Sequence, residues 1–290
     1  MHPSHLHFPL FILLSIWSFS HQLKAQTVCS QSSAELLTQQ LSTMAGQSEL
    51  AQMEIGEAAS HMGQQMLGIP YVARTLELEG PERLVINLEG LDCTTFLENV
   101  VVMARLSQLQ QFTREDYERE LQLIRYRQGE LHEYPSRLHY FSDWLYDNEK
   151  KGVITIVTEA IGGEPYSKEI NFMGQHRSAY AQLADDRYYD AILKAESSIN
   201  QRTHFYIPKE RVQAVEGNIQ SGDLIAITTS INGLDISHVG IAIFQGGRLH
   251  LMHASTSANR VVISSKPLAD YLAGNRSQSG IMVARLTPIQ

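Results

Sequence analysis

Hydrophobic residues in the first half of the chain recur at three- and four-residue steps, with good helix formers between them. This period predicts five helices, at residues 33–44, 49–67, 96–106, 115–125 and 139–150. Gly68 and Pro70 end the second helix, because neither residue favours its continuation. Thr113 is a candidate N-cap for the fourth helix.

The pattern changes after Asp223. Short runs of β-branched and aliphatic residues, separated by turn residues, predict five strands at residues 224–229, 238–244, 249–253, 261–263 and 280–286. Helices first and antiparallel strands last is the order of an α+β domain. The chain has no internal repeat and no low-complexity linker, so we expect residues 26–290 to form a single α+β domain.

Composition narrows the range of partners. The 290 residues are 43% hydrophobic, and the net charge of -8 argues against nucleic acid or an anionic membrane as partner. An anionic ligand would therefore need a local cluster of cations. The two cysteines cannot form a disulfide framework, and no His-Glu-x-x-His or Cys-x-x-Cys motif accompanies the 12 histidines. The sequence thus predicts neither a metal nor a cofactor.

The N-terminus has the pattern of an export signal. Residues 8–19 form an apolar run that is too short to span a bilayer, and Ala25 precedes the expected cleavage point. Residues 1–25 are therefore predicted to be a signal peptide, and the mature protein to be soluble in the periplasm or outside the cell. Cys29 lacks the upstream residues of a lipid-attachment box, so we interpret it as a free thiol rather than a lipid anchor.

Cys93 is the first candidate catalytic residue. It lies in Asp92-Cys93-Thr94-Thr95-Phe96, at the start of the helix predicted from the residues that follow. A cysteine in the first helical turn lies near the positive end of the helix dipole, which favours the nucleophilic thiolate. The alternative role is that of a small buried hydrophobic residue.

His238 opens an apolar strand and is the second candidate, its alternative being a structural histidine at a sheet end. Residues 245–247 (Gln-Gly-Gly) predict a hairpin to the next strand, which carries His250 and His253. A two-residue loop at 245–246 places His253 opposite His238, and one at 246–247 makes it a diagonal neighbour on the same face. A three-residue loop would select His250 instead. We predict that His253 orients His238.

Five short motifs occur in one order along the chain: Gly68-Ile69-Pro70-Tyr71, Asp92-Cys93, Gly222-Asp223-Leu224, His238-Val239-Gly240-Ile241 and His253-Ala254. This order resembles the NlpC-type papain-like cysteine amidases and peptidases of bacterial cell walls. The variant Asp-Cys-Thr-Thr-Phe, with residues 125–129 (Arg-Tyr-Arg-Gln-Gly) and 134–140 (Tyr-Pro-Ser-Arg-Leu-His-Tyr) behind it, is similar more narrowly to the N-acetylmuramoyl-L-alanine amidase-like branch. The resemblance covers nearly all of the chain after its signal.

The resemblance implies a papain-like core, in which the nucleophile helix packs on a small antiparallel sheet and presents a Cys/His/polar triad. Cys93 would attack an amide carbonyl to form a thioester, His238 would pass the proton to the leaving amine, and His253 would fix the imidazole of His238. The Cys93 backbone N–H would stabilise the oxyanion together with Tyr71, the latter by resemblance. Asp92 would either meet the substrate or only cap the helix.

The segment between the cysteine and the histidine is long. Residues 107–215 are patterned like folded chain, and we expect them to be a helical insertion that forms the walls of the substrate cleft. Three arginines in it are candidates for pairing with substrate carboxylates, their alternative being solvation of helix faces: Arg125, Arg127 and Arg137. Three aromatic residues could stack on a sugar, with core packing favoured: Tyr134, Tyr140 and Trp144.

The expected function is that of an exported N-acetylmuramoyl-L-alanine amidase, which hydrolyses the lactyl–L-alanine amide of muropeptides. One alternative keeps the chemistry and moves the bond, as a γ-D-glutamyl–diamino acid endopeptidase. The other alternative is a non-catalytic module that binds peptidoglycan or peptide on the same fold. The presence of Cys93, His238 and His253 argues against a non-catalytic module.

Overall fold

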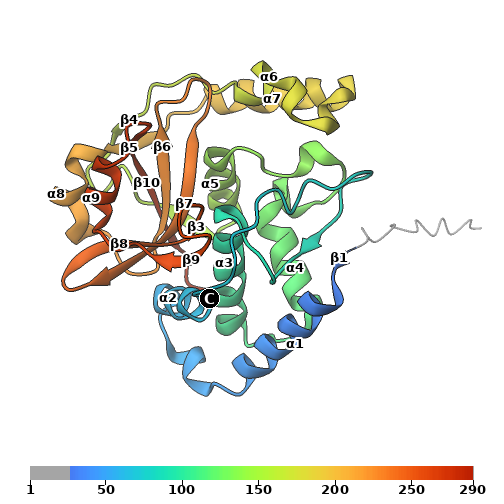
Figure 1. Ribbon diagram of the computed structural model, residues 1–290, viewed down its shortest axis with the longest axis vertical. Coiled ribbons are helices and arrows are strands. Elements are labelled where there is room, and N and C mark those ends of the chain that lie inside the picture. The colour runs from blue at the N-terminus through green and yellow to red at the C-terminus, as the bar shows by residue number, and fades with distance from the viewer. Residues whose placement is uncertain (1–26, 290) are drawn as a thin grey trace, which may run out of the picture.

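The computed structural model describes residues 27–289, so the predicted signal peptide at residues 1–25 lies outside the described part of the chain. The N-terminal helices pack against one face of an antiparallel sheet (Figure 1). The fold is a mixed α+β arrangement, as the order of hydrophobic patterns predicts. No helix within residues 27–289 is long and apolar enough to cross a membrane.

Eight strands of the described residues form the main sheet. They are β3 (Ile154–Ile156), β4 (Glu164–Pro165), β5 (Phe205–Pro208), β6 (Leu224–Thr229), β7 (Ile236–Gln245), β8 (Arg248–Ser255), β9 (Arg260–Ile263) and β10 (Gln278–Leu286). The order is β4-β5-β10-β6-β7-β8-β9, and β3 pairs with β10 outside this path. Every pairing in this sheet is antiparallel. A separate parallel pair joins β1 (Val28–Cys29) to β2 (Val85–Ile86).

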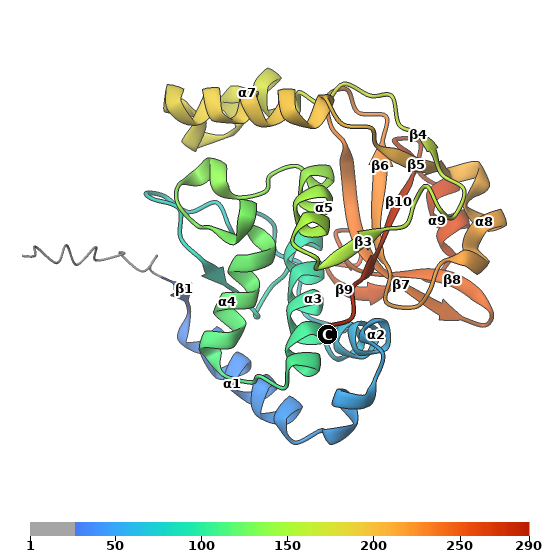
Figure 2. The same ribbon diagram turned by 180° about the vertical axis from the view of Figure 1, so that it is seen from behind.

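Helices cover both faces of the sheet. Their bounds are α1 Gln31–Ala45, α2 Ile55–Gln65, α3 Cys93–Leu109, α4 Arg114–Arg125, α5 Phe141–Lys150, α6 Phe172–Gln175, α7 Asp186–Asn200, α8 Val212–Val215 and α9 Leu268–Ala273. Figures 1 and 2 show α2 and α3 on one face and α8 and α9 on the other, with α6 and α7 together at one end of the molecule. The sheet is therefore a buried layer between two sets of helices.

The strand β6 shows how the sequence produces this layer. All six of its residues are buried, and successive side chains alternate between two cores. Leu224 and Ala226 join the main core with α2 and α3, whereas Ile225 and Ile227 join the core under α8 and α9. Because both faces are covered, the strand begins with a continuous apolar run, Leu224 to Ile227, rather than an alternating one.

The Gly222-Asp223 motif has a structural role at the start of β6. Gly222 has a φ of +91°, and a Cβ at this position would lie only 2.0 Å from the backbone oxygen of Gly56 in α2. The Asp223 carboxylate accepts two hydrogen bonds from Arg285, both at 2.8 Å. The motif therefore allows α2 to approach the sheet closely and ties β6 to β10.

The predicted elements are present, with two differences. The helix expected at residues 49–67 is divided into a 3-10 turn, Ser48–Gln52, and α2. The expectation that residues 107–215 form a helical insertion is incomplete, because β3, β4 and β5 lie in this segment and extend the main sheet. These strands are only two to four residues long, too short for a hydrophobic period to reveal them.

Candidate active site

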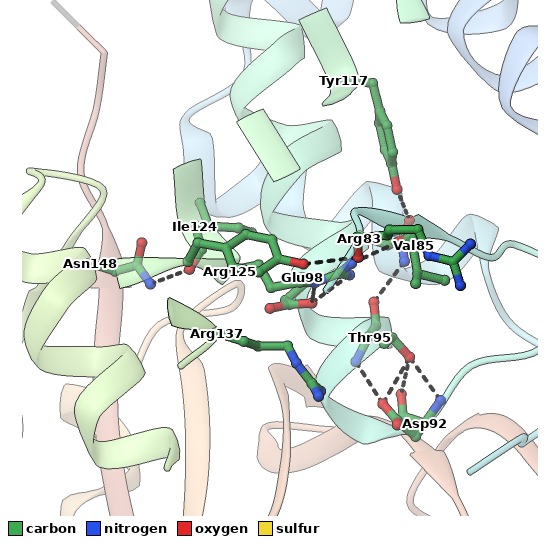
Figure 3. A network of polar contacts seen from close by, with 12 residues as sticks. Arg83, Val85, Asp92, Thr95, Glu98, Tyr117, Ile124, Arg125, Arg137 and Asn148 are labelled. Atoms are coloured by element: carbon green, nitrogen blue, oxygen red, sulfur yellow. Dashed lines mark hydrogen bonds and ion pairs between the residues drawn. The ribbon is translucent and has the colours of Figure 1, made fainter. Parts of the chain in front are cut away.

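Cys93 is the first residue of α3, and a reciprocal cap fixes the turn that presents it. The Asp92 side chain accepts a hydrogen bond from the Thr95 backbone N–H at 2.8 Å, and the Thr95 hydroxyl accepts one from the Asp92 backbone N–H at 2.9 Å (Figure 3). The second threonine of Asp-Cys-Thr-Thr therefore completes a capping box. Asp92 thus caps the helix, and its side chain also lines the cavity described below.

The electrostatic environment of Cys93 differs from the expectation based on its helix position. Burial, followed by the negative charge of Asp92, raises the pKa of the Cys93 thiol to about 11. Hydrogen bonds from the Val239 backbone and from Thr94 lower this pKa, but by less. Desolvation of the charged sulfur therefore opposes the stabilisation of the thiolate that was expected from the helix dipole.

The hairpin of β7 and β8 has the predicted two-residue loop. Gln245 pairs with Arg248, so the loop is Gly246-Gly247, the second of the two registers considered. Both glycines have positive φ values, +57° and +78°, as a type I′ turn requires at its two central positions. This register places His253 diagonally across from His238 on the same face of the sheet.

His238 and His253 contact each other directly. The His238 Nε2 atom lies 2.5 Å from His253 Nδ1, and the rings meet edge to face with 4.8 Å between their centroids. Burial, and then the charge of His253, lower the pKa of His238 to about 3, and burial lowers that of His253 to about 4. Both imidazoles are therefore neutral at neutral pH. This contact leaves His238 Nδ1 available for another partner.

His250 lies on the opposite face of the sheet from His238. It pairs with Ile243 across the hairpin, and its Nδ1 donates a hydrogen bond to the Ser264 carbonyl oxygen at 2.7 Å. The side chain is buried there. The predicted alternation of the two strand histidines is confirmed by this register.

Two tyrosines lie near the proposed catalytic residues. Tyr71 pairs with Leu91, two residues before Cys93, and burial is the main cause of the raised pKa of its phenol. Tyr271 of α9 packs edge to face on His253, with 5.6 Å between ring centroids. Burial is the main cause of the raised pKa of Tyr271, and Cys93 contributes to it. The sequence predicted a role for Tyr71, but no pattern marked Tyr271.

A cavity of about 860 Å³ lies beside the N-terminal end of α3. Asp92, Thr94 and Glu98 line its α3 side, and residues 74–80 line a second side. Most of the remaining wall belongs to the segment 107–215, chiefly around residues 137–140 and 172–188. Within residues 27–289, no group of three or more His, Cys, Asp or Glu side chains is arranged to hold a metal ion.

Arg125 is committed to a buried ion pair rather than free in the cavity. Its side chain is 3% exposed, and its Nε and Nη2 atoms both lie 2.8 Å from the Glu98 carboxylate (Figure 3). Its Nη1 atom donates a hydrogen bond to the Val85 carbonyl oxygen at 2.7 Å. This arginine therefore joins α3, α4 and β2 beneath the cavity.

Arg137 and Arg127 also have protein partners. Arg137 is buried at the cavity wall, 2.7 Å from Glu77 and 3.1 Å from Glu82. Arg127 pairs with Asp143 at 2.8 Å and lies outside the cavity lining. Each of the three predicted arginines is therefore ion paired with an acidic residue of the protein. Their partners are distant in sequence or on other elements, so the sequence pattern gave no sign of these pairs.

The aromatic residues singled out in the sequence pack in the interior. Tyr134, Tyr140 and Trp144 are buried, in agreement with the favoured role in core packing. Three other aromatic residues, which the sequence analysis did not select, are partly exposed and line the cavity: Phe172, Tyr180 and Tyr188. They belong to the segment that contains α6 and α7.

Solved structures that are similar to this chain include an N-acetylmuramoyl-L-alanine amidase from Bacteroides uniformis. It is 37% identical, has a TM-score of 0.77, and the match covers 80% of this chain and 99% of that chain. A Bacteroides fragilis protein described as a candidate xylanase is 36% identical, with a TM-score of 0.74 and coverage of 78% and 100%. A Legionella pneumophila protein, 22% identical with a TM-score of 0.64 and coverage of 88% and 97%, shares the fold. No curated protein sequence matches the chain significantly.

A family model described as AmiA-like, N-acetylmuramoyl-L-alanine amidase-like, matches residues 61–281. The matched segment includes Cys93 at the start of α3, the cavity wall and the hairpin that carries His238 and His253. The chain belongs to this AmiA-like family of N-acetylmuramoyl-L-alanine amidase-like proteins.

Proposed function

We propose that this protein is a cysteine-dependent N-acetylmuramoyl-L-alanine amidase, which hydrolyses the amide between the lactyl group of N-acetylmuramic acid and L-alanine in muropeptides. The observation that carries the proposal is the contact between His238 in β7 and His253 in β8, 2.5 Å apart, on the two strands against which α3 packs with Cys93 as its first residue. Membership of an amidase-like family supports the choice of bond. The proposal includes an NlpC-type papain-like core, an exported protein and residues 1–25 as its signal peptide.

The first half of the proposed reaction forms a thioester. Because Cys93 and His238 are both neutral in the free site, His238 accepts the thiol proton as the sulfur attacks the lactyl carbonyl. His238 then donates this proton to the nitrogen of L-alanine, and the carbon–nitrogen bond breaks. The stem peptide leaves with a free amine, and the muramoyl acyl group remains on Cys93.

The second half regenerates the enzyme. His238 accepts a proton from water, whose oxygen attacks the thioester carbonyl. As the carbon–sulfur bond breaks, His238 returns this proton to the sulfur and restores the Cys93 thiol. The lactyl carboxylic acid leaves with the sugar. In this proposal, His253 Nδ1 holds the His238 ring through its Nε2 atom, and the other ring nitrogen, His238 Nδ1, acts as the base in both steps.

The developing oxyanion needs hydrogen-bond donors near the sulfur. The backbone N–H of Cys93 lies in the first helical turn, where no carbonyl of the same helix accepts it. We assign it as one donor and the Tyr71 hydroxyl as the second, because Tyr71 pairs with Leu91, two residues before Cys93. The neighbouring cavity has room for the groups on either side of the scissile bond.

Incubation of the chain without residues 1–25 with purified muropeptides tests the proposal. We expect mass spectrometry to detect two products, a glycan with a free lactyl carboxylate and a stem peptide that begins with L-alanine. The masses of the two products together exceed that of the substrate by one water. Products in which alanine remains on the glycan, or no cleavage at all, would contradict the proposed amidase.

A further inference from the structure

The cavity is lined by three arginines, and Arg74 differs from the other two. Arg125 and Arg137 are buried and ion paired, as described above. Arg74 is exposed to solvent, and its side chain makes no ion pair or hydrogen bond with any side chain or backbone group of residues 27–289. It is therefore the cationic group of the cavity lining that remains available for a ligand.

The position of Arg74 follows from the backbone beside the cysteine. Tyr71 pairs with Leu91 in a short parallel bridge, and the Val72 backbone N–H donates to the Leu91 carbonyl oxygen at 3.1 Å. Leu91 precedes the Asp92 cap of α3. Arg74 thus lies three residues beyond the proposed oxyanion donor Tyr71, on a segment that starts next to the nucleophile.

The segment that carries Arg74 is held in place at several points. A turn joins the Glu77 backbone N–H to the Arg74 carbonyl oxygen at 3.1 Å, and the Glu77 carboxylate pairs with Arg137 at 2.7 Å. The Leu78 carbonyl oxygen accepts a hydrogen bond from Gln182 at 3.0 Å. Arg74 itself has a φ of +62°, a left-handed conformation that costs energy for a side chain other than glycine. The surrounding contacts therefore hold the backbone of Arg74 in a defined position at the cavity.

Acidic residues in the same lining do not prevent Arg74 from binding an anionic group. Glu98 pairs with Arg125, Glu77 shares Arg137 with Glu82, and the Asp92 carboxylate is engaged as the helix cap. Glu79 is the remaining acid of the lining, and it is exposed to solvent, where water and salt screen its repulsion. A single anionic group of a ligand thus has one suitable partner in the cavity.

We propose that Arg74 is a specificity-determining residue that pairs with a free carboxylate of the stem peptide. The inference rests on the proposed function, which supplies a substrate that carries carboxylates on one side of the scissile amide. Two sources share this chemistry, the α-carboxylate of the D-glutamate residue and the carboxylate at the end of the peptide. A guanidinium can bind either through two parallel hydrogen bonds, whereas an ammonium cannot.

Three muramoyl tripeptides test the proposal: one with both carboxylates free, one amidated at the D-glutamate α-carboxylate and one amidated at the C-terminus. We expect one of the two amidations to lower kcat/KM of the wild type by about tenfold, chiefly through KM, since hydrogen bonds between charged groups are worth about this much. Arg74→Gln is expected to lower kcat/KM about tenfold on the muramoyl tripeptide with both carboxylates free. It should also bring the ratio of kcat/KM between this substrate and the disfavoured amidated one close to one. Arg74→Lys should retain part of the ratio.

Arg119→Gln is the matched control, because it removes the same charge from an exposed site on α4 outside the cavity lining. Arg119→Gln should keep the wild-type ratio of kcat/KM between the free and amidated substrates. The amidated substrate that Arg74→Gln no longer distinguishes from the free one identifies the carboxylate that Arg74 binds. The proposal is overturned if neither amidation affects the wild type, or if Arg74→Gln keeps the wild-type ratio. Calorimetric binding of the peptides to Cys93→Ala, with and without Arg74→Gln, gives the same comparison without turnover. Failure of the amidase proposal therefore appears separately, as an inactive wild type.

Discussion

His238 Nε2 lies 2.5 Å from His253 Nδ1, across a hairpin whose loop is Gly246-Gly247. The neutral rings must share a single proton in this contact, so one nitrogen donates and the other accepts. The same contact fixes the orientation of the His238 ring relative to the start of α3. A small change in the hairpin register would move this partner to the other face of the sheet.

The first prediction concerns this pair. His253→Ala should lower kcat by on the order of a hundredfold or more, because the imidazole of His238 loses the group that orients it. Steady-state kinetics on a muramoyl peptide measure the effect. KM should change much less, since the contact is made by the protein in the presence and absence of substrate.

His250→Ala is the matched control on the same strand. Its side chain bonds to the Ser264 carbonyl oxygen on the opposite face, so kcat should change by less than about fivefold. The thermal midpoint of this variant should fall, since a buried hydrogen bond is lost. A large loss of kcat in folded His250→Ala, with a small loss in His253→Ala, would mean that the pair does not orient the catalytic base.

The second prediction concerns the two thiols. Cys93→Ala and Cys93→Ser should abolish turnover and leave the circular dichroism spectrum unchanged, because the side chain is small and lies at the helix start. Cys29→Ser should be nearly silent, since Cys29 lies in the short strand β1 and is remote in sequence from the proposed site. Appreciable hydrolysis by Cys93→Ala would exclude the cysteine mechanism, and an inactive Cys29→Ser would require a role for the N-terminal thiol.

The third prediction is a pH dependence. Protonated His238 cannot accept the thiol proton, and burial lowers its pKa from the ordinary value of 6.5 to about 3. The decline of kcat/KM on acidification should therefore begin below pH 6.5, so that activity at pH 6 remains close to that at pH 7. A profile that loses half of its activity at pH 6.5 or above would show that a group of ordinary or raised pKa controls the reaction.

Alkylation provides an independent test of the same electrostatics. Burial and Asp92 raise the pKa of Cys93 to about 11, so its thiolate fraction at neutral pH is small. In a Cys29→Ser background, the rate of iodoacetamide labelling should rise by about tenfold per unit from pH 7 to pH 9, following the thiolate fraction. A fast rate that is already constant at pH 7 would reveal a thiolate–imidazolium pair instead. Slow labelling at neutral pH is thus expected of the enzyme itself and does not identify a non-catalytic module.

The fourth prediction concerns the ion pair under the cavity. Arg125→Met should lower the free energy of unfolding by about 3–5 kcal/mol, because it leaves the buried carboxylate of Glu98 without its cation. The charge-neutral double variant, Arg125→Met with Glu98→Gln, should recover most of this loss. Urea denaturation measures both. A single variant within about 1 kcal/mol of the wild type would show that water or another cation replaces Arg125.

The contrast between the hairpin and the arginines shows what the sequence could predict. The face of His253 follows from a two-residue loop and the alternation of side chains along a strand, both of which are local properties. The partner of Arg125 is Glu98, 27 residues away on a different helix, and only the packing of α3 against α4 brings them together. The pKa of Cys93 has the same origin, because burial depends on tertiary contacts while the helix dipole depends on local ones.

The fold shows the same division between features that the local sequence pattern reveals and features that it does not. Most helices and strands with several turns or alternations were predicted near their observed bounds, but the 15-residue helix α7 was missed. The strands β3, β4 and β5 were missed because each is four residues or shorter. Arg74 was missed for a related reason. It lies in an irregular segment with no periodic pattern, and its exposure at the cavity becomes apparent only once Tyr71 and Leu91 are seen to pair.

The last prediction separates the amidase from a γ-D-glutamyl–diamino acid endopeptidase. An amidase of the lactyl–L-alanine bond needs the lactyl carbonyl, so a free stem peptide without sugar should be inert while the muramoyl peptide is cleaved. The endopeptidase would cut the free peptide instead and release L-Ala-D-Glu, and it should prefer a free L-alanine amine to one blocked by sugar. Chromatography of both digests at equal substrate concentration, with Cys93→Ala as the blank, measures the difference. Release of L-Ala-D-Glu from the free peptide would overturn the proposed bond and leave the cysteine chemistry in place, because the same thiol and imidazole can open either amide.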